Sequence, residues 1–434
     1  MDTSAPVRVA CPIASIGPST PAPLGAGHDD PGLRGFVFTL FFVFGGITSL
    51  NDVLIPKLKG LFTLSNAEVL LVQSAFFTAY LLMSLPAAGF VRRYGYMRTA
   101  VIGLATMTVG CLLFVPATAL RTFPGFLGAL FVLASGITIV QVVANPLISL
   151  LGPPQSASSR LTFAQAFNSL GTTVLPYVGS VVILGATVSV TRISSTYVGL
   201  ALALVVVAAA VWSRRNRLAE QGKEEMSISG ALGLLRRGRF ALGAVGIFLY
   251  VGAEVVVGSL MVLYLKQNDV FGVDDESAGK LLPYYWGGMM MGRFAGSALL
   301  RRFKPGHVLA AAGALALLLL LRSGTTTGAV AGWSILGVGL ANSIMFPTIF
   351  SLACQGLGPR TAEGSGLLCV SIVGGAILPP LAGLVADHYS LRAALMVPAA
   401  CYAFILAYGV YALRPVSSLG DPTVSTEYPA LEPR

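Results

Sequence analysis

Long apolar stretches alternate with short polar connections along almost the whole chain, and their length decides what kind of helix they form. A transmembrane helix needs about 20 mostly apolar residues to cross the hydrocarbon core of a bilayer. Twelve stretches reach or approach that length, and the ninth is the shortest. The pattern predicts an all-α membrane protein with twelve transmembrane helices, near residues 35–55, 68–90, 99–119, 125–150, 161–185, 196–213, 241–264, 278–300, 307–321, 327–352, 363–386 and 391–413.

Composition agrees with this pattern. Of the 434 residues, 55% are hydrophobic and only 11% are charged, whereas charged residues make up about 25% of an average soluble domain. The first 34 residues contain no apolar run long enough for a cleaved signal peptide. We therefore expect the first transmembrane helix to act as its own insertion signal.

The positions of the basic residues predict how the chain is oriented. Cytoplasmic connections of membrane proteins carry an excess of Lys and Arg. With the N-terminus inside, most of the 28 Lys and Arg residues fall in the two tails and the cytoplasmic connections. We expect the protein in the plasma membrane, which is the inner membrane of a bacterium, with both termini in the cytoplasm. The net charge of +10 then reflects topology, and no nucleic-acid partner is expected.

One polar connection is much longer than the others and divides the predicted helices six and six. Its sequence is SRRNRLAEQGKEEMSISGALGLLRRGRF. The predicted organisation is a cytoplasmic N-terminal tail (1–34), a first six-helix half (35–213), a cytoplasmic linker (214–240), a second six-helix half (241–413) and a cytoplasmic C-terminal tail (414–434).

The two halves repeat each other in sequence. QVVANPLISLLGP (141–153) and NSIMFPTIFSLACQGLGP (342–359) each place an amide five residues before a proline. SLGTTVLPYVG (169–179) and IVGGAILPPLAG (372–383) each carry a glycine followed by Leu-Pro. Parallel repeats of six helices are typical of the major facilitator fold, in which the substrate site lies near the bilayer midplane between two pseudo-symmetric halves. The repeat also predicts that Gln141 and Asn342 face each other across the pseudo-twofold axis.

Two acidic residues, Asp52 and Glu254, lie within predicted transmembrane helices. An Asp at the centre of such a helix costs about 2.5 to 3.5 kcal/mol on insertion scales, so intramembrane carboxylates usually face a cavity and mark an ion or substrate path. We expect both to take part in proton coupling. The alternative for Asp52 is that it lies near the external end and pairs with Lys57 or Lys59.

Glu254 shares a helix face with Tyr250 and Gly258, because residues four apart are neighbours on a helix surface. That face can present a carboxyl and a phenol to a cavity. The alternative is a structural hydrogen bond to another helix. The glycines Gly288, Gly292 and Gly296 form a stripe that is typical of close helix packing.

Several amides also lie within predicted transmembrane helices. Gln165 and Asn168 are three residues apart, and Gln141 and Asn145 are four apart, so each pair can share one helix face. Amides offer both donors and an acceptor without charge, which suits the hydroxyls of a neutral sugar. The aromatic residues considered for stacking against the sugar, with helix packing as the alternative, are Tyr80, Tyr284, Tyr285 and Trp286.

The sequence contains no pattern that indicates catalysis, a metal or a cofactor. Neither HExxH nor GxSxG occurs, and the three histidines lie in predicted tails and loops or at the end of a helix. Four of the five cysteines lie in or at the ends of predicted transmembrane helices, where cysteines usually fill space. We expect neither an enzyme nor a cofactor, and a monomer whose partners are the lipid bilayer, a small neutral sugar and a coupling ion.

Beyond these patterns, the sequence resembles the fucose/glucose/galactose permease family of sugar:proton symporters in the major facilitator superfamily. The resemblance rests on LNDVLIPKLKGLFTLS, RRYGYMR, ANPLISLLGP, SRLTFAQAFNSLGTT, YVGAE, MGRFAG and SIMFPTIFSLA, which together span about residues 40 to 390. It implies that Asp52 is the proton-linked carboxylate and that Gln165 and Asn168 line the sugar cavity. The L-fucose branch has a glutamate where this chain has Gln141, so the chain is more similar to the glucose/galactose branch.

Together these observations predict a secondary active transporter that imports a neutral hexose, glucose or galactose, coupled to protons by alternating access. The alternatives are a sodium-coupled or passive transporter of another sugar, such as N-acetylglucosamine, mannose or fucose, and a membrane sugar sensor that does not transport. The predicted proton-coupling residues are Asp52 and Glu254, and the predicted sugar-binding residues are Asn51, Gln141, Gln165, Asn168, Asn342 and Tyr250.

Overall fold

A computed structural model describes the chain over residues 31–62, 66–120, 122–184, 190–216 and 228–414. Within these ranges all regular secondary structure is helical. The first half contains α1 (Pro31–Phe62), α2 (Asn66–Tyr94), α3 (Tyr96–Leu120), α4 (Phe123–Leu150), η1 (Pro154–Ser156), α5 (Ala157–Leu184) and α6 (Val190–Ser213). The linker contributes α7 (Ile228–Gly233) and η2 (Leu234–Arg236). The second half contains α8 (Gly238–Leu265), α9 (Asp275–Arg302), α10 (Pro305–Thr325), α11 (Gly328–Asn342), α12 (Met345–Cys354), η3 (Gly358–Arg360), α13 (Thr361–Val370), η4 (Ser371–Val373), α14 (Gly374–His388), α15 (Leu391–Ala394) and α16 (Met396–Tyr411).

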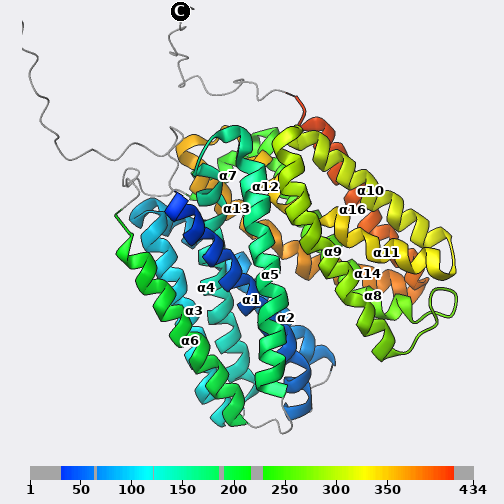
Figure 1. Ribbon diagram of the computed structural model, residues 1–434, viewed down its shortest axis with the longest axis horizontal. Helices are drawn as coiled ribbons and strands as arrows, with labels where there is room; N and C mark the ends of the chain where they lie inside the picture. Colours follow the sequence, from blue (N-terminus) through cyan, green and yellow to red (C-terminus); the bar gives the residue numbers. More distant parts are fainter. Residues whose placement is uncertain (1–30, 63–65, 121, 185–189, 217–227, 415–434) are drawn as a thin grey trace, which may run out of the picture.

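Length and hydropathy identify most of the membrane-spanning helices. Among the described residues, ten helical segments are long and apolar enough to cross a membrane. The ninth predicted transmembrane helix, the shortest in the sequence pattern, is longer in the structure. It corresponds to α10, which has 21 residues. The helices α5 and α9 have 28 residues each, and they also lie alongside the others in the two bundles (Figure 1). These two helices carry several of the candidate site residues, and they lie where two further transmembrane helices were predicted.

The last three predicted transmembrane helices are each interrupted, which sequence periodicity did not indicate. The break between α11 and α12 precedes Pro347, and the break between α15 and α16 precedes Pro398. Proline lacks an N–H, and its ring clashes with the carbonyl of the residue four positions earlier. That residue is Ser343 for Pro347 and Ala394 for Pro398. The third break, at η4, is followed directly by Gly374 and Gly375. The first of these breaks lies beside Asn342, a candidate site residue.

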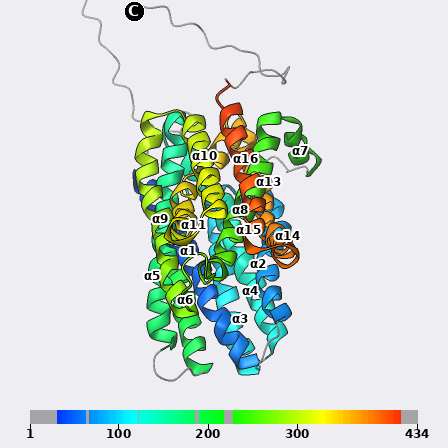
Figure 2. The ribbon, with the colours of Figure 1, turned by 90° about the vertical axis from the view of Figure 1, so that its right-hand side faces the viewer.

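The helices of the two halves pack in the same order. In the first half α1 packs against α5, α2 against α4, and α3 against both α4 and α6. In the second half α8 packs against α14, α9 against α11, and α10 against both α11 and α16. Figure 1 shows the two bundles next to each other. Turned by 90°, the helices of both bundles run roughly along one common axis (Figure 2). The repeat predicted from the sequence is therefore present as two pseudo-symmetric bundles.

The repeated glycines make equivalent contacts in the two halves. A Cβ added to Gly171 would collide with the carbonyl oxygen of Phe42 in α1, and a Cβ added to Gly374 would collide with the carbonyl oxygen of Phe248 in α8. Both glycines thus let the first helix of a half approach the fifth one closely. The glycine stripe on α9 is also confirmed as a packing surface, since Gly292 and Gly296 lie against the break between α11 and α12.

Replacing Gly374 by Ala is expected to lower the stability of the folded protein. Overpacking in a close-packed interior typically costs about 1 to 3 kcal/mol, and the obstacle here is helix backbone, which cannot rotate away. The matched control is Gly383→Ala in the same helix, where nothing lies within 4 Å of the added Cβ. That control gains up to about 1 kcal/mol of helix propensity. Thermal unfolding in detergent compares the two, and equal unfolding temperatures would contradict the close contact.

The halves meet at one end of the bundle, which we call the basic end because Arg92, Arg93, Arg301, Arg302 and Arg360 lie there. The ribbons of the two halves converge at this end and diverge toward the other (Figure 1). The joint is itself pseudo-symmetric, since α5 packs against α9 and α12 while α13 packs against α2 and α4.

Hydrogen bonds cross the joint at several points. The Ser158 hydroxyl in α5 donates to Ser351 in α12 over 2.9 Å, and Ser159 donates to the carbonyl of Ser297 in α9 over 2.6 Å. The Ser365 hydroxyl in α13 donates to the carbonyl of Val142 in α4 over 2.8 Å. These small hydroxyl groups allow a tight polar joint near the basic end.

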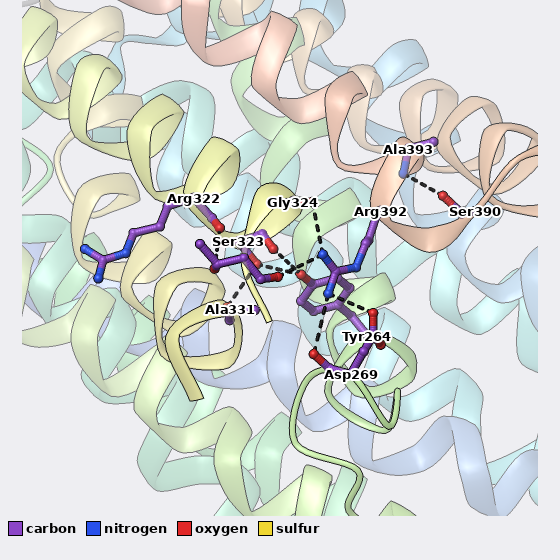
Figure 3. Close-up of polar contacts among 10 residues, drawn as sticks. Tyr264, Asp269, Arg322, Ser323, Gly324, Ala331, Ser390, Arg392 and Ala393 are labelled. Atoms are coloured by element: carbon purple, nitrogen blue, oxygen red, sulfur yellow. Dashed lines mark hydrogen bonds and ion pairs between the residues drawn. The ribbon is translucent and has the colours of Figure 1, made fainter. Parts of the chain in front are cut away.

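At the opposite end, a polar cluster fixes the second half internally (Figure 3). The Arg392 guanidinium, at the start of α15, forms an ion pair of 2.8 Å with Asp269 in the α8–α9 connection. It also donates to the carbonyls of Gly324 and Thr326 at the end of α10. The Tyr264 hydroxyl in α8 donates to the carbonyl of Ser323 over 2.6 Å. The ends of α8, α10 and α15 are thus joined to one another.

Candidate functional site

Several neutral polar side chains are buried without a hydrogen-bond partner among the described residues. A buried polar group left unsatisfied costs about 1 to 3 kcal/mol, so native structures rarely retain one without a reason such as a missing ligand or water. These groups come from helices of both halves that meet in the bundle, and the atoms are Gln141 Oε1, Asn145 Oδ1 and Nδ2, Asn342 Oδ1, Thr348 Oγ1 and the Tyr402 hydroxyl. They define the candidate site.

The contribution of the first half comes from α4 and α5. Gln141 and Asn145 are both buried in α4, as their four-residue spacing predicts. Gln165 is buried in α5, and its backbone carbonyl accepts a hydrogen bond from α9. Asn168 is half-buried and donates to the carbonyl of Phe41 in α1 over 3.3 Å. Asn168 therefore also holds α5 against α1, a role that its sequence context did not indicate.

The contribution of the second half is a chain of hydrogen bonds around Asn342. The Tyr250 hydroxyl in α8 donates to the backbone carbonyl of Asn342 over 3.1 Å. The Asn342 side-chain amide donates to the Tyr285 hydroxyl in α9 over 2.9 Å. The Tyr402 hydroxyl lies next to the Asn342 side chain but without hydrogen-bond geometry. Asn342 is thus held from α8 and α9, while its side-chain oxygen stays available.

Glu254 lies beside this chain of hydrogen bonds, one helical turn after Tyr250 in α8. The Tyr250 hydroxyl and the Arg293 guanidinium act on its carboxyl electrostatically, but among the described residues neither forms a hydrogen bond or an ion pair with it. Residues four apart share a helix face, which accounts for the position of Tyr250. The shared face predicted for Glu254 and Tyr250 is confirmed, although the Tyr250 hydroxyl is also bound to α11.

Arg293 is a buried charge in the middle of α9 that sequence reasoning did not assign to the site. Its guanidinium donates to the Gln165 carbonyl over 3.0 Å and to the Ser169 hydroxyl, both in α5. The only signal in the sequence was a basic residue within an otherwise apolar stretch. Thr348 and Tyr402 were also missed, because single hydroxyl groups in apolar helices are common and their partners are not visible in sequence.

Two predicted site residues lie where the side chains are outside the described residues. The helix α1 continues through Asn51 and Asp52 without a break, but the side chains of residues 50–71 are not described. The same applies to Lys57 and Lys59, the alternative partners of Asp52. The roles predicted for Asn51 and Asp52 therefore remain predictions.

The aromatic candidates for stacking have different surroundings. Tyr285 is fully buried and serves as a hydrogen-bond partner of Asn342. Tyr80 is buried and packs against Phe76 in its own helix. Tyr284 is exposed and packs against Trp333 with 5.4 Å between the ring centroids. For Tyr80 and Tyr284 the packing alternative fits these contacts better than stacking on a ligand.

The chemistry of the site favours a neutral polyhydroxylated ligand. Amide and hydroxyl groups can each donate and accept hydrogen bonds without charge. Among the described residues, no group of three or more His, Cys, Asp or Glu side chains could hold a metal ion. A ligand held among these groups would meet neutral donors and acceptors from both halves.

Comparison with known proteins gives consistent matches over most of the chain. The family model described as Major Facilitator Superfamily matches residues 37–370. A glucose/galactose transporter of Brucella abortus is 47% identical over 386 residues, covering 87% of this chain and 94% of the relative. The L-fucose-proton symporter of Escherichia coli is 31% identical over 403 residues, covering 85% of this chain and 90% of the symporter.

Solved structures agree with the sequence matches. The transporter FucP in the outward conformation superposes with a TM-score of 0.81 at 28% identity, covering 88% of this chain and 98% of FucP. The proton:xylose symporter XylE, at 12% identity and a TM-score of 0.67, shares the fold. The chain belongs to the major facilitator superfamily, within its fucose/glucose/galactose permease family.

Proposed function

We propose that this protein imports a neutral hexose, glucose or galactose, together with protons. The observation that carries the proposal is the set of buried neutral polar atoms without partners among the described residues, contributed by both halves. Sugar hydroxyls would satisfy those groups. The relatives are named glucose/galactose transporter and L-fucose-proton symporter, which supports both the sugar and the proton. The chain is accordingly a transporter and not an enzyme.

The proposed site combines the predicted residues with those found in the structure. Asp52 and Glu254 are assigned to proton coupling. The sugar-binding set combines the residues predicted from sequence with those found through their unsatisfied atoms: Asn51, Gln141, Gln165, Asn168, Asn342 and Tyr250, and Asn145, Thr348 and Tyr402. The glucose/galactose assignment follows from Gln141, which stands where the L-fucose branch is expected to have a carboxylate.

Transport is proposed to proceed by alternating access. The conformation described here is joined at the basic end, and it superposes on FucP in the outward conformation. If the basic end faces the cytoplasm, as the distribution of Lys and Arg suggests, sugar and proton enter from outside. Because a ligand shifts an equilibrium only by its differential affinity for the two states, sugar and proton must each favour the occluded form. The protein is proposed to act as a monomer in the plasma membrane, with both termini in the cytoplasm.

The test is the external pH of a weakly buffered, de-energised suspension of cells that express the protein. We expect the pH to rise when glucose or galactose is added, since each imported sugar removes a proton from the medium. Fucose, mannose and N-acetylglucosamine, added separately, test the choice of sugar. Cells that carry the empty vector are the control.

The other outcomes separate the alternatives. Uptake of labelled sugar without a pH change, but dependent on sodium, would contradict proton coupling. Uptake that neither ion affects would indicate passive transport. Binding without any uptake would make the protein a sensor and overturn the proposed function.

A further inference from the structure

Asn342 stands at the break between α11 and α12, and its side chain is fully buried. Tyrosines from two other helices bind it. Tyr250 in α8 binds its backbone carbonyl, and Tyr285 in α9 binds its side-chain amide. The remaining side-chain atom, Oδ1, has no partner among the described residues. The way the two tyrosines hold Asn342 therefore decides where this oxygen points.

The helix break gives Tyr250 a carbonyl to bind. The last four carbonyls of an α-helix have no partner within the helix and need donors from elsewhere. Asn342 is the last residue of α11, and α12 begins only at Met345. The Tyr250 hydroxyl, which is itself buried, donates to the Asn342 carbonyl over 3.1 Å. Tyr250 thus fixes the backbone at the residue whose side chain belongs to the candidate site.

Tyr285 reaches the Asn342 side chain because α9 and α11 approach each other closely beside it. A Cβ added to Gly339 would collide with the backbone carbonyl oxygen of Tyr285. Gly339 lies three residues before Asn342, which is about one helical turn. From this position the Tyr285 hydroxyl accepts a hydrogen bond from Nδ2 of Asn342 over 2.9 Å. With Nδ2 bound in this way, Oδ1 is the atom left for another donor.

We propose that Tyr285 is a positioning residue for sugar binding, which acts through Asn342. Its hydroxyl holds Nδ2 of Asn342, so that Oδ1 accepts a hydrogen bond from a sugar hydroxyl. Binding is tighter when a polar group is already held in its bound orientation, because less side-chain freedom is lost. The inference rests on the proposed function and deepens it. It gives Tyr285 a role in the site other than stacking on the sugar or packing alone.

The experiment measures the affinity of the purified full-length chain for glucose and galactose in detergent. The rise in unfolding temperature with sugar concentration gives the dissociation constant and remains measurable when binding is weak. Tyr285→Phe keeps the ring but removes the partner of the Asn342 amide. The dissociation constant should rise about two- to tenfold, as expected for the loss of one ordinary hydrogen bond. The maximal rate of sugar exchange in proteoliposomes should stay close to that of the wild type.

A double-mutant cycle tests whether Tyr285 acts through Asn342. Asn342→Ala removes the proposed acceptor and should weaken binding on its own. Adding Tyr285→Phe to Asn342→Ala should weaken binding no further. Equal weakening by Tyr285→Phe in both backgrounds would mean that Tyr285 contacts the sugar directly, and would overturn the proposal. An unchanged dissociation constant in Tyr285→Phe alone would also overturn it.

The matched control is Tyr264→Phe in the polar cluster at the end opposite the basic end (Figure 3). Tyr264 is fully buried like Tyr285, and its hydroxyl donates to the Ser323 carbonyl over 2.6 Å. Both variants lose hydrogen bonds of a buried phenol, so both should unfold at a lower temperature. Only Tyr285→Phe should change the dissociation constant.

The remaining outcomes separate this proposal from the proposed function. Equal loss of affinity in Tyr264→Phe and Tyr285→Phe would show a general effect of lower stability and would overturn the role of Tyr285. Wild-type protein that binds neither sugar would instead contradict the proposed function.

Discussion

Asp52→Asn is expected to abolish accumulation of sugar against its gradient while exchange of labelled for unlabelled sugar continues. Asparagine has nearly the shape of a protonated aspartate but cannot release a proton. The loaded carrier can therefore still reorient in both directions, whereas the step that uses the proton gradient is lost. Proteoliposomes with an imposed pH gradient measure accumulation, and the same vesicles without a gradient measure exchange.

The matched control for this prediction is Asp387→Asn, which removes an exposed carboxylate near the end of α14. It should accumulate sugar like the wild type, because a solvated carboxylate outside the candidate site has no part in coupling. If Asp52→Asn still concentrates sugar, the role proposed for Asp52 is wrong. The alternative, in which Asp52 forms a surface ion pair with Lys57 or Lys59, would then be favoured, because such a pair does not couple transport to the proton gradient.

Glu363→Gln is expected to shift the protein strongly toward a conformation open at the basic end. Glu363 in α13 is only 6% exposed. It forms ion pairs of 3.3 Å with Arg92 in α2 of the other half and of 3.0 Å with Arg360. Breaking a buried ion pair by removing one partner costs about 3 to 5 kcal/mol, because the remaining charge stays buried. Here that cost falls on the conformation in which the halves are joined.

Native Cys369 reports on this shift. It is fully buried in α13, close to Tyr80 of α2 across the joint. Opening of the basic end should expose it to N-ethylmaleimide, and peptide-resolved mass spectrometry distinguishes it from the other cysteines. We expect Cys369 to react faster in Glu363→Gln than in the wild type, by about a hundredfold to a few thousandfold if the full cost applies, since each 1.4 kcal/mol corresponds to a factor of ten.

A second ion pair supplies the control. Glu276 pairs with Lys280 over 2.7 Å within α9, and both side chains are largely exposed, at 76% and 70%. Such exposed pairs contribute about 0.3 to 0.5 kcal/mol. Glu276→Gln should therefore leave the reactivity of Cys369 unchanged. Equal reactivity of Cys369 in Glu363→Gln and in the wild type would contradict the view that this pair closes the basic end.

The sequence alone determined the architecture, because a bilayer imposes strong constraints on a chain. Backbone groups in hydrocarbon must be satisfied within a helix, so each long apolar stretch predicts a helix directly. The repeated glycine and proline patterns predicted two halves, and the equivalent contacts of Gly171 and Gly374 confirm the repeat. The burial of Gln141, Asn145, Gln165 and Asn342 was likewise visible, since polar residues in such stretches seldom face lipid.

Only the tertiary structure decided which partners these residues have. Sequence spacing places Tyr250 and Glu254 on one helix face, but it cannot show that Tyr250 binds the Asn342 carbonyl from another helix. Nor can it show that Arg293 reaches α5, or that Glu363 joins α13 to α2. The physical reason is that these contacts join residues more than 90 positions apart, and they depend on how whole helices pack rather than on local periodicity.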